Sequence, residues 1–120
     1  KISFRKTSKF YSKKFRKFQK LDRLIMKAYW VCIFEKINNT DKLKEYAIRA
    51  KPAVEKFSGK FLARGGKNRT NEGIISPRVV VVEFPNYNTA VECYDSEEYQ
   101  EAHNILNGYV ERHHQIVEGT

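Results

Sequence analysis

Apolar positions along the chain fall into continuous runs and helical stripes, and this pattern predicts the secondary structure. The segment 28–36 is rich in aromatic and β-branched residues, which is typical of a strand buried on both faces. Residues 38–41 then supply turn and N-cap side chains for an amphipathic helix. Its apolar stripe follows helical spacing and consists of Leu43, Tyr46, Ala47, Ala50, Val54 and Phe57.

Proline and glycine mark where these elements end or change. Pro52 lies inside the helical stripe, so we expect a kink there or a second helical segment that starts at this residue. Ser58-Gly59 ends the helix, and residues 60–64 predict a second strand. Gly65-Gly66 indicates a bulge or a close backbone approach in that strand. The polar segment 67–76 is predicted to be a hairpin region.

The second half of the chain repeats this order. Residues 78–84 give the clearest strand signal and lie between Pro77 and Pro85, which cannot continue a central ladder. A helical stretch follows from Asn86 and breaks before Ser96, which can cap a further helix. Residues 110–118 predict the last strand. The order β-α-β-β-α-β predicts an α+β, ferredoxin-like domain over residues 26–120, with a four-stranded antiparallel sheet and its helices on one face.

The face of the sheet that the helices leave uncovered predicts a partner. Both parities of the strands at 28–36 and 78–84 are apolar, so about five sizeable apolar side chains remain on the open face whichever parity faces the helices. At roughly 1.5–3 kcal/mol each, their exposure costs on the order of 10 kcal/mol, against a domain stability of about 5–15 kcal/mol. The simplest cover is the same sheet of a second copy, so we expect a homodimer.

Charge separates the first 25 residues from the rest. Residues 1–25 carry ten Lys/Arg and one acidic residue, Asp22, whereas residues 26–120 carry thirteen side chains of each sign. We therefore expect no nucleic-acid binding through residues 26–120. We interpret residues 1–25 as a disordered basic tail or an upstream artefact, with a membrane- or nucleic-acid-binding segment and a targeting peptide as the alternatives. No segment is long and apolar enough to be a transmembrane helix, and a cytoplasmic location is expected.

Several segments are similar to those of a known family, the domain-of-unknown-function 1330 family in the dimeric α/β-barrel superfamily. The similar segments follow one another in the right order: residues 29–30, 59–66, 77–85, 93–100 and 116–119. The resemblance implies two ferredoxin-like protomers whose sheets pack into a barrel. It implies no established activity, although the superfamily includes cofactor-independent monooxygenases, muconolactone isomerases and haem enzymes.

A site in this architecture is expected in the cleft between helices and sheet. Arg64 and Arg78 are candidate anion-binding residues, with Glu83 as a candidate catalytic base and His103 as a candidate acid or base. Three tyrosines are candidate hydrogen-bond donors to a ligand: Tyr46, Tyr94 and Tyr99. The structural alternative is that Arg64 pairs with Glu83 across neighbouring strands and that His103 lies on a helix surface.

Neither a metal nor a cofactor is expected. His113 and His114 are adjacent in a strand and therefore point to opposite faces, so they cannot share one metal ion. Gly65-Gly66 lacks the spacing of a phosphate-binding loop. Cys32 and Cys93 are interpreted as buried residues rather than nucleophiles. We thus expect a homodimer whose cleft binds a small anionic or aromatic metabolite; the alternative is a cofactor-independent monooxygenase or isomerase.

Overall fold

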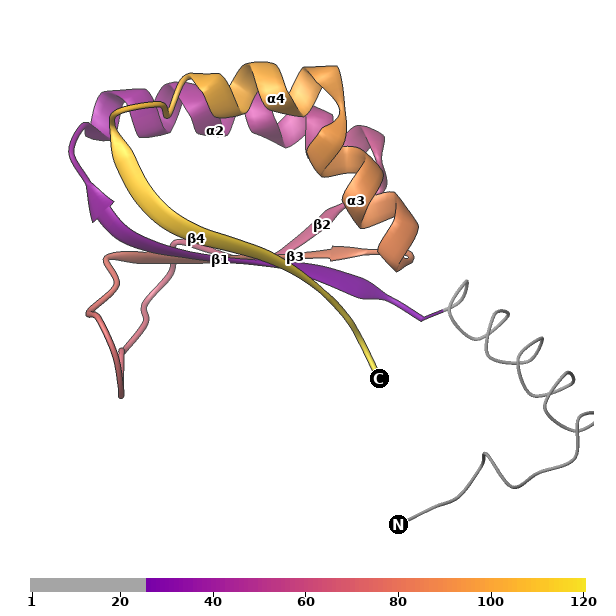
Figure 1. Cartoon of the computed structure of the whole chain (residues 1–120), viewed down its shortest axis with the longest axis horizontal. Helices are drawn as coiled ribbons and strands as arrows, with labels where there is room; N and C mark the ends of the chain where they lie inside the picture. Colours follow the sequence, from indigo (N-terminus) through magenta and orange to yellow (C-terminus); the bar gives the residue numbers. More distant parts are fainter. Residues whose placement is uncertain (1–25) are drawn as a thin grey trace, which may run out of the picture.

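The computed structural model describes residues 26–120, so the basic segment 1–25 lies outside the described residues. The elements follow in the order β1 (Ala28–Ile37), α2 (Thr40–Lys56), β2 (Lys60–Arg64), β3 (Arg78–Phe84), α3 (Tyr87–Asp95), α4 (Glu97–Asn104) and β4 (Val110–Glu118). The four strands form one antiparallel sheet in the order β2-β3-β1-β4, and the three helices lie on one face of it (Figure 1). The α+β, ferredoxin-like prediction is therefore confirmed.

Local chemistry fixes where the helices begin and end. The side chain of Asn39 accepts a hydrogen bond from the Lys42 amide at the start of α2, and Asn86 and Ser96 cap α3 and α4 in the same way. The helix α2 is continuous through Pro52, so it does not restart there as a second helix. It ends at Lys56, and the chain then turns at Ser58, whose φ is 63°. A Cβ atom at Gly59 would collide with Val54, which explains why glycine follows.

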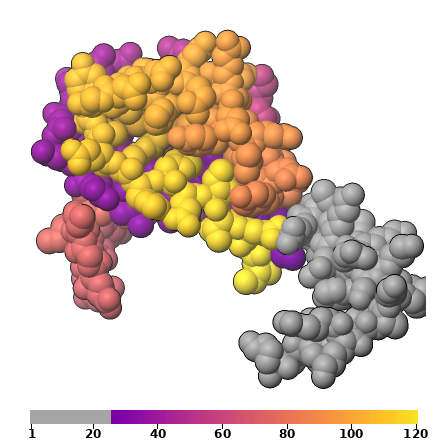
Figure 2. Space-filling model, in the orientation of Figure 1, coloured from indigo at the N-terminus to yellow at the C-terminus, as the bar shows by residue number. Residues whose placement is uncertain are grey.

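The strand β2 differs in one detail from the prediction. Its bulge lies between Phe61 and Ala63, where the register with β3 shifts, and the strand ends at Arg64. The sequence predicted either a bulge or a close backbone approach at Gly65-Gly66, and of these two the bulge inside the strand is wrong. Gly65 instead turns the chain out of the sheet with a φ of +75°. The following loop, residues 65–77, projects from the body of the molecule on the side away from the helices (Figures 1 and 2).

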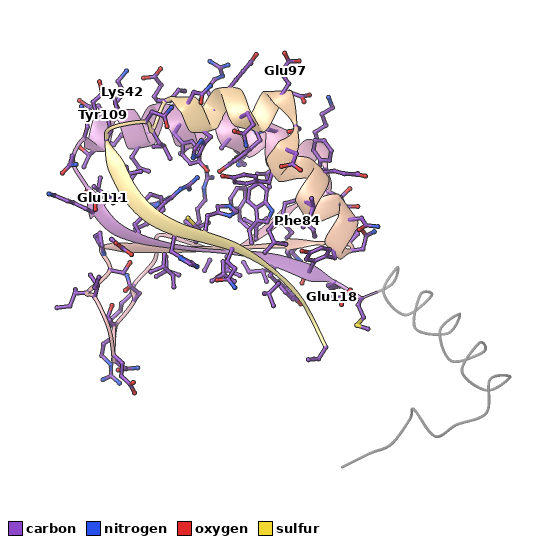
Figure 3. The ribbon with its side chains drawn as sticks, in the orientation of Figure 1. Lys42, Phe84, Glu97, Tyr109, Glu111 and Glu118 are labelled. Carbon is purple, nitrogen blue, oxygen red and sulfur yellow. The ribbon has the colours of Figure 1, made fainter. Side chains whose placement is uncertain are left out.

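The core lies between the helices and the sheet, and side chains of both layers fill this space (Figure 3). Trp30 points from β1 toward the helices, where its indole N–H donates to the Ala90 carbonyl over 3.0 Å. The residues on the opposite side of β1 are half-buried or exposed, and Ile33 has 39% of its surface exposed. Within the described chain, β1 is thus buried on one face only. No helix formed by residues 26–120 has the length and apolar character needed to cross a membrane.

Candidate functional site

Cross-strand register gathers cationic side chains at one place on the helix-facing side of the sheet. Phe34 of β1 is paired with Arg78 of β3 on one side and with Arg112 of β4 on the other. Directly opposed residues of neighbouring antiparallel strands share a face. Two residues further along each strand, and therefore on the same face, Cys32 of β1 is paired with His114 of β4. Two arginines and a histidine therefore lie on the face that the helices cover.

These residues surround a cavity beneath α2. Its volume is about 30 Å³, which is room for roughly one or two water molecules or one carboxylate group. Its polar lining consists of Cys32, Tyr46, Arg64, Arg78, Arg112 and His114, and the remaining lining residues are apolar. No Asp or Glu of the described residues lines it. The cavity is therefore positively charged, with apolar walls.

Arg112 is held deep in the cavity by neutral groups. Its guanidinium donates to the Tyr99 hydroxyl over 2.8 Å and to the Cys32 sulfur over 3.2 Å. It also lies 5.4 Å from the centre of the Phe34 ring. Burial disfavours its charge, but the neighbouring groups Tyr46, Tyr99 and Cys32 together raise its pKa. Arg112 is therefore always charged, yet it has no ion-pair partner among the described residues.

Arg78 lies on the other side of Phe34, with its guanidinium carbon 5.9 Å from the ring centre. Its Nε atom is buried and finds no hydrogen-bond partner among the described residues. Burial and then the charge of Arg64 lower its pKa. Gly65 makes room for this side chain, because a Cβ atom there would collide with Nη1 of Arg78. Gly65 thus leaves the space that the guanidinium of Arg78 occupies.

Arg64 is exposed and lies at the edge of the cavity. Its Nη2 donates to the Ala47 carbonyl of α2 over 3.0 Å, and its guanidinium stacks 4.4 Å from the centre of the Phe61 ring. The side chain thereby connects β2 with α2. It does not pair with Glu83 as the structural alternative required, so its charge stays available at the entrance.

His114 supplies the neutral polar group of the cavity. Its ring packs edge-on against Trp30 and at a tilt against Tyr94, each with a distance of 4.8 Å between ring centres. Burial and the charge of Arg112 lower the pKa of His114 to about 3. The imidazole is therefore neutral at physiological pH, and its buried Nε2 atom has no hydrogen-bond partner among residues 26–120.

The tyrosines and His103 take different positions around this site. Tyr46 lines the cavity, and its hydroxyl lies 2.7 Å from that of Tyr99, which is fully buried behind Arg112. Tyr94 contacts the site through the His114 ring rather than through the cavity wall. His103 of α4 packs against Tyr94 and Tyr99 and does not line the cavity, and burial and then Arg112 lower its pKa.

Glu83 lies outside the site, which corrects its assignment as a base in the cleft. It is paired with Tyr29 on the face of the sheet away from the helices. Its carboxylate there forms an ion pair with Lys27, with a nitrogen–oxygen distance of 3.2 Å. Successive side chains of a strand point to opposite faces of the sheet. Because Phe84 is fully buried under the helices, its neighbour Glu83 points to the other face.

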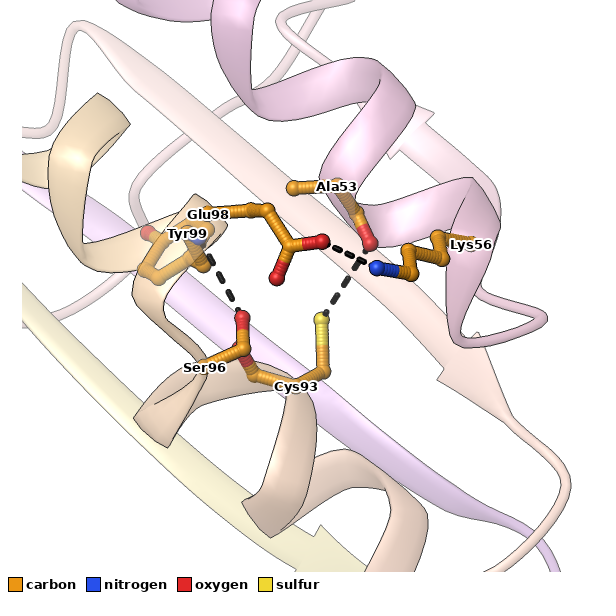
Figure 4. Close-up of polar contacts among 6 residues, drawn as sticks. All are labelled: Ala53, Lys56, Cys93, Ser96, Glu98 and Tyr99. Atoms are coloured by element: carbon orange, nitrogen blue, oxygen red, sulfur yellow. Dashed lines mark hydrogen bonds and ion pairs between the residues drawn. The ribbon is translucent and has the colours of Figure 1, made fainter.

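Cys93 is buried at the contact between α2 and the α3–α4 corner (Figure 4). Its sulfur lies 3.9 Å from the Ala53 carbonyl oxygen, and an ion pair between Lys56 and Glu98 lies nearby. Burial and the nearby Glu98 charge raise the pKa of the Cys93 thiol to about 12. A thiol protonated to that degree is a poor nucleophile.

The register also separates the two adjacent histidines. His114 opposes Cys32 on the helix side, whereas His113 opposes Ile33 on the open side and bonds to Gln115 over 2.7 Å. The prediction that they face opposite ways is confirmed. In the part of the chain that the structure describes, no three His, Cys, Asp or Glu side chains gather as metal ligands would.

Arg112 and His114 were missed in the sequence as site residues. A signal was present, because the alternation in β4 places them on the same face as Ile116. An arginine and a histidine on the face that packs against helices are unusual, since that face is normally apolar. Because residues 110–118 are polar on both sides of the strand, the sequence did not show which side packs against the helices.

Comparisons with known proteins agree with this fold. Residues 27–120 match the model of a family described as a domain of unknown function, DUF1330. No curated protein matches the chain. The protein of unknown function RPA0582 from Rhodopseudomonas palustris is similar in structure, with a TM-score of 0.65 at 15% identity over 95% of each chain.

Two further solved structures share the fold at low identity. SnoaB, a cofactor-independent oxygenase from Streptomyces nogalater, has a TM-score of 0.59 at 10% identity, covering 79% of this chain and 94% of its own. An ethd family protein from Bacillus halodurans has a TM-score of 0.51 at 11% identity, covering 79% of this chain and all of its own. At such identities the likeness establishes the fold alone.

Proposed function

The chain belongs to the family described as domain of unknown function DUF1330, and on that premise we propose that it binds a small carboxylate in the cavity beneath α2. The carboxylate group is held between Arg78 and Arg112, beside the neutral His114. The observation that carries the proposal is the cavity's uncompensated positive charge. Three guanidiniums line it, and no described carboxylate does.

Such an arrangement is costly in a protein without a ligand. Like charges in a partly buried site repel one another, and a buried donor without an acceptor costs about 1–3 kcal/mol. Arg78 has both problems, since its Nε is unpartnered and Arg64 is close enough to lower its pKa. An anion between the guanidiniums removes both costs, and this supports anion binding as the use of the site.

A carboxylate fits the site better than a phosphate. The enclosed volume of about 30 Å³ matches one planar group of two oxygens, which an arginine fork binds side by side. Around it the lining is aromatic and aliphatic, suited to the carbon chain of an organic acid.

An NMR titration with sodium butanoate at constant ionic strength tests the proposal on the full chain. We expect backbone shifts at β1, β3 and β4 around the cavity, and their loss in Arg112→Met. Arg49→Met is the matched control, because Arg49 is an exposed residue whose partner is Glu101. Equal titration of wild type and Arg112→Met would contradict binding in this cavity.

We also propose that two copies pack open face against open face. The support is a group of apolar side chains on the side of the sheet away from the described helices: Tyr29, Val31, Ile33, Val79, Val81 and Val117. In the described chain, Ile33 and Val117 have 39% and 47% of their surface exposed to solvent. A second identical sheet would remove this apolar surface from water.

Light scattering at micromolar concentration tests the dimer. Wild type is expected at twice the mass of one chain, and Val81→Glu is expected to dissociate because it buries a charge in the contact. Ile48→Glu on the outer side of α2, where Ile48 is 74% exposed, is the control that should stay dimeric. A folded wild-type monomer would refute the proposal.

The two free buried cysteines support a reducing, cytoplasmic location.

A cofactor-independent oxygenase or isomerase is the second candidate, supported by the fold likeness to SnoaB. Such a reaction needs a base, and the cavity offers the unpartnered His114 Nε2. A pKa of about 3 makes this imidazole a weak base, so we rank binding first. Oxygen uptake that depends on the bound carboxylate and is lost in His114→Phe would reverse this ranking.

A further inference from the structure

The arrangement of the three arginines carries information about the ligand beyond its carboxylate group. We infer that the ligand is a dicarboxylate, with one carboxylate deep in the cavity between Arg78 and Arg112 and the second at the entrance with Arg64. This inference rests on the proposed binding function and specifies the chemical class of ligand.

The positions of the arginines define two anion subsites rather than one. Arg112 and Arg78 are the direct neighbours of Phe34 in one row across the sheet. Arg64 lies on the neighbouring strand β2 and is paired with Val80, which is two residues beyond Arg78 in β3. Arg112 is deep in the cavity, whereas Arg64 is exposed. The charges therefore continue from the interior to the entrance.

The hydrogen bonds show that Arg64 is held at the entrance rather than free in solvent. Its guanidinium is fixed by the Ala47 carbonyl and stacks on the Phe61 ring. Only one of its five N–H groups is used by this contact, so the others remain for an anion. A long side chain anchored to both layers at the opening of a cavity is placed to bind a ligand group that emerges from it.

The surface between the two subsites suits a short carbon chain. The cavity lining beside Arg64 is apolar: Arg64 bonds the Ala47 carbonyl, stacks on Phe61 and is paired with Val80, and all three residues line the cavity. A monocarboxylate would compensate one of three positive charges, whereas a dicarboxylate compensates two. Since like charges that remain unpaired reduce the gain from binding, the second carboxylate should contribute a clear increase in affinity.

Titrations with matched pairs of acids test this inference at constant ionic strength and pH 7.5. The probes are succinate against butanoate and glutarate against pentanoate, with inorganic sulfate as a compact dianion. At least one dicarboxylate is expected to bind about tenfold more tightly than the monocarboxylate of equal length. Arg64→Gln should reduce this ratio to near one, because it removes the cation of the second subsite.

Arg69→Gln is the matched control, because Arg69 is an exposed arginine of the 65–77 loop that bonds Asn71 and does not line the cavity. It should keep the wild-type ratio. Equal affinity for mono- and dicarboxylates, or an unchanged ratio in Arg64→Gln, would overturn the dicarboxylate and leave the proposed carboxylate binding intact. Sulfate binding as tight as that of the best dicarboxylate would also overturn it. Absence of binding by every carboxylate would overturn the proposed function itself.

Discussion

The guanidinium of Arg112 donates a hydrogen bond of 2.8 Å to the hydroxyl of Tyr99. The bond joins β4 to α4, and the acceptor is a neutral phenol rather than a carboxylate. It fixes the orientation of the arginine without cancelling its charge. A half-buried cation held in this way is ready to bind an anion, whereas one paired with Asp or Glu would have to give up its partner first.

The first prediction concerns the Tyr99 hydroxyl. Tyr99→Phe removes the acceptor of Arg112 and breaks the contact with the Tyr46 hydroxyl. We expect the free energy of unfolding to fall by about 1–2 kcal/mol and butanoate binding to weaken. Urea unfolding measures the first effect. Tyr87→Phe is the control, since Tyr87 is 42% exposed, and a Tyr99→Phe variant as stable as this control would be contrary to the structure.

The second prediction concerns Gly65, whose φ is +75° and whose missing Cβ leaves space for Arg78. Gly65→Ala should cost about 1 kcal/mol in backbone strain and also displace the guanidinium, so that butanoate binding weakens. Gly73→Ala provides a matched control. Gly73 has a φ of +93° with open space around its Cβ position, so it should show strain without loss of binding. Equal binding by the two variants would show that Arg78 does not depend on Gly65.

The third prediction separates stability from binding at Arg78. Because its buried Nε has no described partner and Arg64 repels it, Arg78→Met should raise the free energy of unfolding of the ligand-free protein by about 1 kcal/mol. The same variant should lose butanoate binding. Thermal unfolding with and without butanoate measures both effects. A marked loss of stability would mean that Arg78 is a structural residue.

The fourth prediction concerns pH. The pKa of His114 is about 3 in the folded protein and near 6.5 when unfolded, so between these values the unfolded state binds more protons. The part of the free energy of unfolding that depends on His114 is therefore fully present above about pH 6.5. It is lost progressively as the pH falls from 6.5 toward 3. We expect stability to drop on the order of 2 kcal/mol between pH 7 and pH 5.

Urea unfolding at several pH values measures this slope. His114→Phe keeps a ring between Trp30 and Tyr94 but removes the titrating group, so its slope should be smaller. The remaining slope includes His103, whose pKa is also lowered. An identical slope in the variant and the wild type would place the pH dependence elsewhere.

Much of the fold follows from local sequence patterns. Apolar runs, helical stripes and capping residues such as Asn39, Asn86 and Ser96 depend on neighbours along the chain, so the order of strands and helices could be predicted. The last strand was predicted with the bounds it has, Val110–Glu118. Arg64 and Arg78 were identified as anion-binding candidates from their residue type, and Arg64 also from its place beside Gly65 in the sequence.

The composition of the site was decided by the tertiary structure. Both faces of β1 and β3 are apolar, so the sequence could not tell which one packs against the helices, and a shift of one residue exchanges the faces of a whole strand. Packing against α2, α3 and α4 fixed that choice, turning Arg112 and His114 inward and Glu83 outward. Secondary structure is set by residues close together in the chain, whereas the cavity depends on strand register that brings Cys32 and Arg112, 80 positions apart, into contact.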